Sequence, residues 1–332
     1  MVRISVLLPI RNASATLDQA LGSLAAQTFS DFEVIAVDDG SDDDTPRLLS
    51  DWASRDRRIR SSTTPPLGIV SALNTAAAGA RGELLARMDA DDVAVSTRFE
   101  RQLALLDTHP DLAACGSRVR YVPRDVVRDG ALRYERWVNS VVTPEDMHRD
   151  LFVECPIPHP SLVVRRSAFE LVGGYRDMGW PEDYDLLLRL WEAGYQFGKV
   201  PEVLLEWRER PDRLSRIDSR YSEEAFRLCK VYFLGRRIAG RPVVVWGAGP
   251  VGKAFARALQ DEGHRVVAFV DLDHRKIGQT IHGAPVVHPT AIGKYEDAFI
   301  VAAVGSADAR AEIRDSLRAA GFKEPENCCA VA

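Results

Sequence analysis

Short apolar runs alternate with helix-like stretches through the first hundred residues, and this alternation limits the folds open to the chain. The predicted strands are 4–8, 33–37, 59–63 and 83–88. The predicted helices are 15–26, 45–53, 69–78 and 97–107. Strands and helices in regular alternation are typical of a mostly parallel sheet with helices on both faces. We therefore predict an α/β fold.

The pattern changes near Gly240, where we place a domain boundary. A long helix is predicted over about 216–238, and Arg241-Pro242 ends it because proline breaks a helix. A strand over 243–246 follows directly. We therefore divide the chain into a domain over 1–240, which includes that helix as an extension, and a small α/β domain over 241–332.

Two acidic clusters follow predicted strands. Asp38-Asp39-Gly40-Ser41 ends one strand, and Asp89-Ala90-Asp91-Asp92 follows another. Ligands of such sheets bind outside the carboxyl ends of the strands. Three carboxylates within four residues repel one another, and oxygen ligands of this kind suit Mg²⁺ or Mn²⁺. From the residues alone, a metal site and a solvated turn that caps the next helix both stay open.

A glycine-rich loop opens the second domain. Gly247, Gly249 and Gly252 form a G-x-G-x-x-G pattern between a predicted strand and a predicted helix, and Asp271 ends the next strand. This context fits a Rossmann-like unit in which backbone amides face a phosphate and Asp271 reaches a ribose hydroxyl. Glycines that serve only a tight turn are the alternative. The unit is short for a complete dehydrogenase.

Composition excludes some classes of protein. The net charge of −5 gives no reason to expect nucleic-acid binding. The five cysteines form no C-x-x-C pair, which predicts reduced thiols in a cytoplasmic protein.

The first apolar run is short and ends in proline, so we interpret it as a strand, and no apolar run is long enough to span a membrane. Peripheral attachment at the inner face of the membrane and a homo-oligomer both stay open.

Six short motifs resemble those of family 2 glycosyltransferases of the GT-A fold. They are Pro9-Ile10-Arg11-Asn12, Val37-Asp38-Asp39-Gly40-Ser41, Ala72-Leu73-Asn74, Ala80-Arg81-Gly82-Glu83, Met88-Asp89-Ala90-Asp91-Asp92 and Glu182-Asp183. They stand in the family's order and spacing, and the resemblance covers roughly residues 2–215. It implies a GT-A nucleotide-diphospho-sugar transferase domain.

The resemblance implies a donor site and a metal site. Pro9 and Asp39 match positions that hold the nucleobase and ribose of the donor. Asp89 and Asp91 match the D-x-D motif, whose Mn²⁺ or Mg²⁺ bridges the donor's phosphates, and Asp92 belongs to the same cluster. The residues expected to bind the donor are Pro9, Asn12, Asp39, Asn74, Arg81, Asp89 and Arg208.

The resemblance also implies a general base. Asp183 matches it and precedes the predicted helix 184–193, whose dipole favours the ionised carboxylate that a base needs. Glu182 is expected to orient the acceptor. One displacement with one base predicts inversion at the anomeric carbon. His159 matches a recurrent position, where a catalytic role and a role in fixing a loop both stay open.

The chain departs from the family after the base helix. The family often carries a histidine where Arg210 stands, and arginine is not expected to ligate a metal. Arg208, Arg210 or Arg213 would instead suit the donor phosphates, because the planar guanidinium binds them in pairs of hydrogen bonds. A solvated basic loop is the alternative.

The expected function is transfer of a sugar, from a UDP-sugar by family precedent, to a hydroxyl of a glycan, a lipid-linked or another acceptor in polysaccharide or glycoconjugate biosynthesis. The second domain looks like nucleotide-binding domains of sugar-modifying enzymes, which bind NAD or nucleotide sugars. Two rival functions stay open: an NAD-dependent oxidoreductase acting on a sugar nucleotide, and a non-catalytic nucleotide-sugar sensor.

Overall fold

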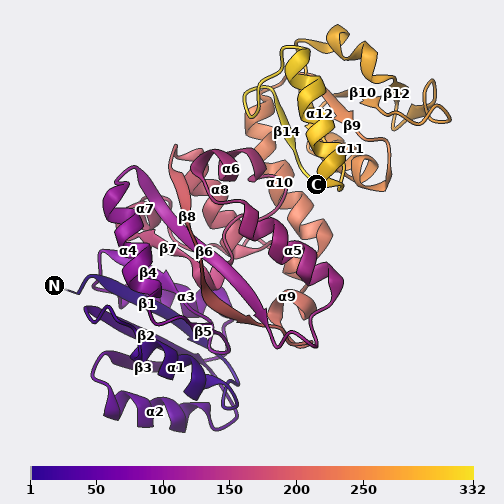
Figure 1. The fold of residues 1–332 in the computed structure, drawn as a ribbon. Helices are drawn as coiled ribbons and strands as arrows, with labels where there is room; N and C mark the ends of the chain where they lie inside the picture. Colours follow the sequence, from indigo (N-terminus) through magenta and orange to yellow (C-terminus); the bar gives the residue numbers. More distant parts are fainter. Residues whose placement is uncertain (1) are drawn as a thin grey trace. The chain divides into compact units, whose positions relative to one another are not determined.

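The computed structural model describes residues 2–332, which form two compact units (Figure 1). The first unit contains the chain up to Met147, Pro156–Met178 and Glu182–Ile217. The second contains His148–Cys155, Gly179–Pro181 and Asp218–Ala332. The last junction between the units, from Ile217 to Asp218, lies within the helical extension predicted over about 216–238.

An eight-stranded sheet forms the centre of the first unit, in the order β3-β2-β1-β4-β7-β6-β8-β5. Its strands are β1 (Ile4–Ile10), β2 (Phe32–Asp39), β3 (Ile59–Thr64), β4 (Leu84–Arg87), β5 (Val93–Ala94), β6 (Leu112–Val122), β7 (Val163–Arg165) and β8 (Gln196–Arg208). Strand β1 pairs in parallel with β2 and β4, whereas β7 runs antiparallel to β4 and β6. The predicted α/β fold with a mostly parallel sheet is confirmed.

Helices connect these strands (Figure 1). They are α1 (Leu17–Ala25), α2 (Thr45–Arg55), α3 (Ile69–Ala78), α4 (Arg98–Thr108), α5 (Asp129–Ser140), α6 (Pro144–Asp150), the 3-10 turn η1 (His159–Ser161), α7 (Arg166–Leu171), α8 (Glu182–Glu192) and α9 (Leu214–Ile217). Each long helix buries one apolar face, as in α1, where Leu17, Leu21 and Leu24 point inward at helical spacing.

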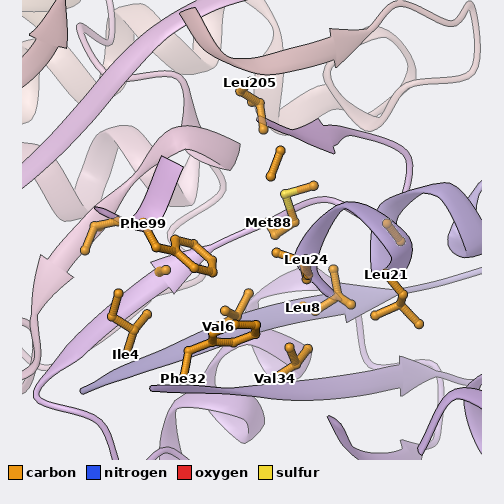
Figure 2. Packing of buried hydrophobic residues seen from close by; sticks show 14 of the residues in the cluster. Ile4, Val6, Leu8, Leu21, Leu24, Phe32, Val34, Met88, Phe99 and Leu205 are labelled. Atoms are coloured by element: carbon orange, nitrogen blue, oxygen red, sulfur yellow. The ribbon is translucent and has the colours of Figure 1, made fainter. Parts of the chain in front are cut away.

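The core of the first unit lies between the sheet and its helices. Figure 2 shows Ile4, Val6 and Phe32 from the parallel strands together with Phe99 from α4. The rings of Phe32 and Phe99 meet edge to face with centroids 5.3 Å apart. Every residue of β1 and β2 is buried, because a central parallel strand is covered on both faces.

The helix predicted over about 216–238 is interrupted. The structure has α9, then the 3-10 turn η2 (Ser219–Tyr221), and then α10 (Glu223–Ile238). Helix α10 begins where it does because the hydroxyl of Ser222 accepts a hydrogen bond from the backbone N–H of Ala225 (3.2 Å).

The second unit holds a six-stranded sheet in the order β11-β12-β10-β9-β13-β14. Its remaining elements are β9 (Val243–Trp246), α11 (Pro250–Asp261), β10 (Val266–Val270), β11 (Thr280–Ile281), β12 (Ala284–Val287), η3 (Pro289–Tyr295), β13 (Phe299–Ala302), α12 (Ala307–Ala319) and β14 (Cys328–Ala330). Strand β9 pairs in parallel with β10 on one side and β13 on the other, so the chain reverses its direction of winding at β9. Within residues 2–332, no helix is long and apolar enough to span a bilayer.

Candidate active site

Three aspartates gather in the turn that joins β4 to β5. The carboxylates of Asp89, Asp91 and Asp92 have oxygen atoms within 4.8 Å of one another. Burial raises the pKa of Asp92 well above its ordinary value, and the charges of Asp89 and Asp91 raise it further. The pKa of Asp91 is raised by burial and by the charge of Asp89. Because the three carboxylates repel one another, a positive charge beside them is strongly favoured.

The end of β8 fixes this turn. The backbone N–H of Arg208 donates to Asp92 Oδ1 (2.8 Å), and Arg208 Nε donates to the carbonyl oxygen of Asp91 (2.8 Å). Antiparallel pairing of Val93 with Glu206 holds the two segments together. Arg208, which we expected at the donor phosphates, thus lies beside the cluster, and part of its hydrogen-bonding capacity is used to hold the turn.

Arginines from outside the turn supply positive charge. Arg87 forms an ion pair with Asp89, and Arg210 Nη2 lies 3.2 Å from Asp91 Oδ2. The side chain of Arg213 is mostly buried above Trp207, and its charge also acts on Asp91 and Asp92. We expected Arg208, Arg210 or Arg213 at the donor phosphates, and did not predict that arginines offset the charge of the aspartates. A charged residue at the end of the apolar stretch Leu84–Met88 was the available signal for Arg87.

The acidic cluster fits a divalent cation. Its donors are carboxylate oxygens, the ligands that Mg²⁺ and Mn²⁺ prefer. Asp92 Oδ2 is buried and has no hydrogen-bond partner in the part of the chain that the structure describes. An unpaired buried carboxylate oxygen is unfavourable, and a cation beside it would remove the penalty. Asp89 and Asp91 keep partial exposure, 29% and 17% of their side chains, and so remain open to a ligand.

The predicted nucleobase and ribose residues lie at the same edge of the sheet. Pro9 is next to Val37 in the register of β1 and β2. Asp39 is buried, and its carboxylate accepts hydrogen bonds from the backbone N–H groups of Leu67 (2.8 Å) and Gly68 (3.0 Å). Gly68 has φ +89°, a conformation that favours glycine. Asp39 therefore shapes the loop that enters α3.

Asn12 joins two loops at this edge. It has φ +49°, and its backbone N–H donates to Ser41 Oγ (2.8 Å). Its Oδ1 accepts a hydrogen bond from the N–H of Asp42 (3.0 Å). The loops that follow β1 and β2 are thereby joined at this edge of the sheet.

Two other residues that we expected to bind the sugar donor are Arg81 and Asn74. The first lies elsewhere, and the second is already hydrogen-bonded within the protein. Arg81 is at the opposite edge of the sheet, where its guanidinium binds Glu33 (2.7 Å) and its N–H bonds Ser5 Oγ, near the start of β1. We therefore remove Arg81 from the donor site. The amide of Asn74 holds the backbone of Tyr175 through both of its polar atoms (2.9 and 3.1 Å), which leaves it little capacity for a donor.

The predicted base lies in the first turn of α8. Asp183 is half-buried, and its Oδ1 accepts a hydrogen bond from the backbone N–H of Tyr184 (2.8 Å). The helix N-terminus favours its ionised form. Glu182, which we expected to orient the acceptor, is only 1% exposed and lies 3.5 Å from His159 Nδ1. It cannot meet an acceptor directly, because the surrounding chain covers it.

His159 belongs to a buried polar group. Its Nε2 lies 2.9 Å from the hydroxyl of Tyr175, and its Nδ1 faces Glu182. Burial lowers the pKa of His159 well below its ordinary value, and the charge of Arg87 lowers it further. A neutral imidazole bridging two buried groups favours the role in fixing the local structure. Tyr175 was missed from the sequence.

Comparison with known proteins decides the family. Residues 5–173 match the sequence model of glycosyl transferase family 2. The chain belongs to glycosyl transferase family 2. The resemblance seen in the motifs is thereby confirmed, and this protein is a glycosyltransferase.

Relatives of this glycosyltransferase include EpsE of Bacillus subtilis (strain 168), which is 30% identical over 227 residues, covering 66% of this chain and 78% of EpsE. The amylovoran biosynthesis glycosyltransferase AmsE of Erwinia amylovora is 27% identical over 215 residues, covering 64% and 78%.

Solved structures share its fold. Residues 1–349 of TarS from S. aureus in complex with UDP-GlcNAc align with a TM-score of 0.53 at 18% identity, covering 71% of this chain and 66% of that one. The mannosyltransferase PcManGT from Pyrobaculum calidifontis, in complex with GDP-Man and Mn²⁺, aligns with a TM-score of 0.52 at 21% identity, covering 78% and 68%. The predicted GT-A fold is confirmed.

The second unit of this glycosyltransferase matches a different sequence model, described as C2185-like, N-terminal, over residues 240–326. A Cβ on Gly252 would come within 1.8 Å of the carbonyl oxygen of Gly247. The missing side chain at Gly252 therefore allows the first turn of α11 to lie against the loop at Gly247. A Cβ on Gly249 would meet no atom within 4 Å. Asp271 accepts hydrogen bonds from Ala248 N–H (2.9 Å) and Lys276 Nζ (2.9 Å), so its carboxylate is tied to the loop.

Proposed function

We propose that this glycosyltransferase moves a sugar from a nucleoside-diphosphate sugar, a UDP-sugar in our hypothesis, to an acceptor hydroxyl with inversion at the anomeric carbon. The observation that carries the proposal is the cluster of Asp89, Asp91 and Asp92 at the carboxyl edge of the sheet, in the same compact unit as Asp183. The ligands named for TarS, UDP-GlcNAc, and for PcManGT, GDP-Man and Mn²⁺, support it.

In this proposal the nucleotide lies along the edge formed by β1, β2 and β4. Pro9, Asn12 and Asp39 bind the nucleoside end, and the acidic cluster lies at the phosphate end. Asp89 and Asp91 would hold Mn²⁺ or Mg²⁺, with Asp92 in the same cluster, and the ion would supply positive charge against the charge that grows on the diphosphate. Arg208 and Arg210 stand beside the same cluster and supply further positive charge.

The reaction itself exchanges one bond for another. The acceptor oxygen forms a bond to the anomeric carbon while the bond from that carbon to the phosphate oxygen breaks. The proton of the acceptor hydroxyl passes to a carboxylate oxygen of Asp183. The nucleoside diphosphate leaves with the bonding electrons. Because a single displacement inverts the configuration at the anomeric carbon, the product has the anomeric configuration opposite to that of the donor.

The acceptor in this proposal is a glycan, a lipid-linked glycan or another hydroxyl compound of polysaccharide assembly. The name of AmsE, an amylovoran biosynthesis glycosyltransferase, supports that setting. We further propose that the reaction takes place in the cytoplasm, at the inner face of the membrane when the acceptor is lipid-linked.

For the second domain, residues 241–332, we propose a Rossmann-like nucleotide-binding role. The parallel order of strands around β9 supports it, because ligands of such sheets bind where the winding reverses. Gly249 supports it as well. Its φ of −85° does not require glycine, and the space in front of it is open, so the missing side chain leaves room for a ligand beside the backbone. The ligand would be NAD or a nucleotide sugar, with Gly247 and Asp271 shaping the loop.

The experiment that tests the catalytic proposal is donor hydrolysis without an acceptor. The full chain and its Asp91→Ala variant are incubated with UDP-, dTDP- and GDP-sugars, with Mn²⁺, Mg²⁺ or EDTA, and released nucleoside diphosphate is measured. We expect metal-dependent release that Asp91→Ala abolishes, and a released sugar of inverted configuration in proton NMR. If none of the donors is hydrolysed or shows metal-dependent binding by calorimetry, the proposal is wrong.

A further inference from the structure

The loop 172–175, which follows α7, is bound to the side of α3. Asn74 Nδ2 donates a hydrogen bond to the carbonyl oxygen of Tyr175 (2.9 Å), and the backbone N–H of Tyr175 donates to Asn74 Oδ1 (3.1 Å). Gly174 has φ +65°, and a Cβ on it would come within 3.2 Å of Asn74 Oδ1. The glycine therefore allows the loop to lie directly against Asn74.

The same loop is bound to α8, the helix that carries the proposed base. The guanidinium of Arg189 donates to the carbonyl oxygens of Val172 (2.6 Å) and Gly174 (2.7 Å). Its Nε donates to Asp185, one turn earlier in α8 (2.7 Å). Because the planar guanidinium is buried and held on all three sides, it fixes the loop to the helix. The loop 172–175 thus joins α3 to α8.

Tyr175 also reaches the first turn of α8 through its side chain. Its hydroxyl lies 2.9 Å from His159 Nε2, and His159 Nδ1 lies 3.5 Å from a carboxylate oxygen of Glu182. Glu182 is the first residue of α8 and immediately precedes Asp183. The contacts of Tyr175 therefore extend to the residue next to the proposed base.

The other end of α3 meets the nucleoside side of the proposed donor site. The carboxylate of Asp39 accepts hydrogen bonds from the backbone N–H groups of Leu67 (2.8 Å) and Gly68 (3.0 Å), and Gly68 directly precedes α3. The inner face of α3 is buried and packs on β1 and β2. A close-packed helix of this kind is rigid, so Asn74 stands at a fixed distance from Asp39.

We propose that Asn74 is a positioning residue, which fixes the helix of the base relative to the donor edge of the sheet, and that it is not a ligand of the donor. The inference rests on the proposed function, because it takes Asp183 as the base and Asp39 as a nucleoside-binding residue. A loop that only connected α7 to α8 would not need to be bound to α3. A base must lie within hydrogen-bond reach of the acceptor hydroxyl, so the position of its helix decides the rate.

Asn74→Ala tests the proposal, because it removes both hydrogen bonds to Tyr175. The variant and the wild-type full chain are compared in metal-dependent hydrolysis of the donor found in the panel above. Calorimetry measures the Kd for the nucleoside diphosphate of that donor. We expect kcat to fall about 10–100-fold, since a displacement of about 1 Å costs a rate of this order, while KM and Kd stay within about twofold. Loss of a donor ligand would instead raise KM and Kd.

Asn139→Ala is the matched control. Asn139, in α5, holds Val119 of β6 in the same way: its Nδ2 donates to the carbonyl oxygen (2.8 Å) and its Oδ1 accepts from the N–H (2.9 Å). Each substitution removes two hydrogen bonds from a half-buried asparagine, so we expect both to lower Tm by a similar amount, about 2–6 °C. Only Asn74→Ala should lower kcat. Circular dichroism checks that both variants are folded in the assay.

The same substitution in the Asp183→Asn protein shows whether Asn74 acts through the base. If Asn74 serves to place Asp183, its loss should lower the residual kcat of Asp183→Asn by less than about twofold. A substitution that loosens the site in general would lower both rates by the same factor, and that result would overturn the proposal.

The remaining outcomes separate the two claims. If the wild type hydrolyses no donor, the proposed function fails and this inference fails with it. If the wild type is active but Asn74→Ala and Asn139→Ala change kcat alike, or Asn74→Ala raises KM and Kd with little change in kcat, the inference alone is wrong. Should Asn74→Ala not fold, Asn74→Asp, which keeps the acceptor for the N–H of Tyr175 but loses the amide donor, takes its place with the same criterion.

Discussion

The guanidinium of Arg210 lies 3.2 Å from the carboxylate of Asp91, within the cluster that we propose to hold a divalent cation. An arginine and a metal ion bound to one carboxylate compete for the same negative charge. This relationship, and others described above, lead to four predictions.

Removing Arg210 should strengthen binding of the metal alone. In Arg210→Ala the charge that opposes a cation at Asp91 is gone, so we expect Mn²⁺ to bind roughly 3–10-fold more tightly in the absence of nucleotide, about one kcal/mol. Electron paramagnetic resonance of free Mn²⁺ measures this directly. Arg47→Ala, on an exposed face of α2, is the control and should leave Mn²⁺ affinity unchanged. Weaker Mn²⁺ binding in Arg210→Ala would contradict the competition.

Replacing Asp183 should stop transfer without loss of donor binding. We expect Asp183→Asn to lower kcat by about 10²–10⁴-fold, the usual contribution of a general base, while nucleotide binding measured by calorimetry stays within about twofold. Asp185 provides the contrast, because it is buried and pairs with Arg189 (2.7 Å). Asp185→Asn should destabilise the fold by about 3–5 kcal/mol in urea unfolding. Full activity of Asp183→Asn would remove it from the role of base.

Glu33 should make the free energy of unfolding depend on pH in the acid range. Burial alone would raise its pKa, but hydrogen bonds from Arg81, Ser5 and Arg60 outweigh burial and lower the pKa from 4.5 to about 2. Because the folded state then holds fewer protons than the unfolded state, its stabilisation is present above pH about 4.5 and is lost as the pH falls towards about 2. Glu33→Gln should lower the free energy of unfolding by about 2–3 kcal/mol at pH 7 and much less near pH 2. A difference that is independent of pH in urea unfolding would contradict this.

Two glycines of the second unit should respond differently to alanine. A methyl group on Gly252 would collide with the carbonyl oxygen of Gly247, so we expect Gly252→Ala to destabilise this unit by about 2 kcal/mol or more. Gly249→Ala, with open space and an ordinary φ, should change stability by less than about 0.5 kcal/mol. Thermal unfolding measures both. If the unit binds NAD or a nucleotide sugar, calorimetry should detect binding in the wild type and its loss in Gly249→Ala.

The sequence predicts well what depends on neighbouring residues. The run of apolar residues in β1 and the helical spacing in α1 are local patterns, and both elements lie within a few residues of their predicted positions. The region after Arg118 has no such pattern. There β6 continues to Val122 because it pairs with β8, about ninety residues later in the chain, and α5 follows at Asp129.

The chemistry around the acidic cluster was predicted less completely, for the same reason. Asp89, Asp91 and Asp92 are close because they share one turn, which the sequence displays directly. The ion pair of Arg210 with Asp91 depends on the pairing of β5 with β8, which only the fold supplies. Arg81 was placed wrongly because a motif fixes order along the chain but not the edge of the sheet that a side chain faces.

The bonds from Arg208 to Asp91 and Asp92 also bear on how this protein is made. The acidic turn leaves the ribosome long before the end of β8 has been synthesised, so a nascent chain carries its three aspartates without the strand that orients them. Only when β8 has emerged and paired with β5 is the turn fixed. The order of translation therefore delays the assembly of the acidic site until nearly all of the first unit exists.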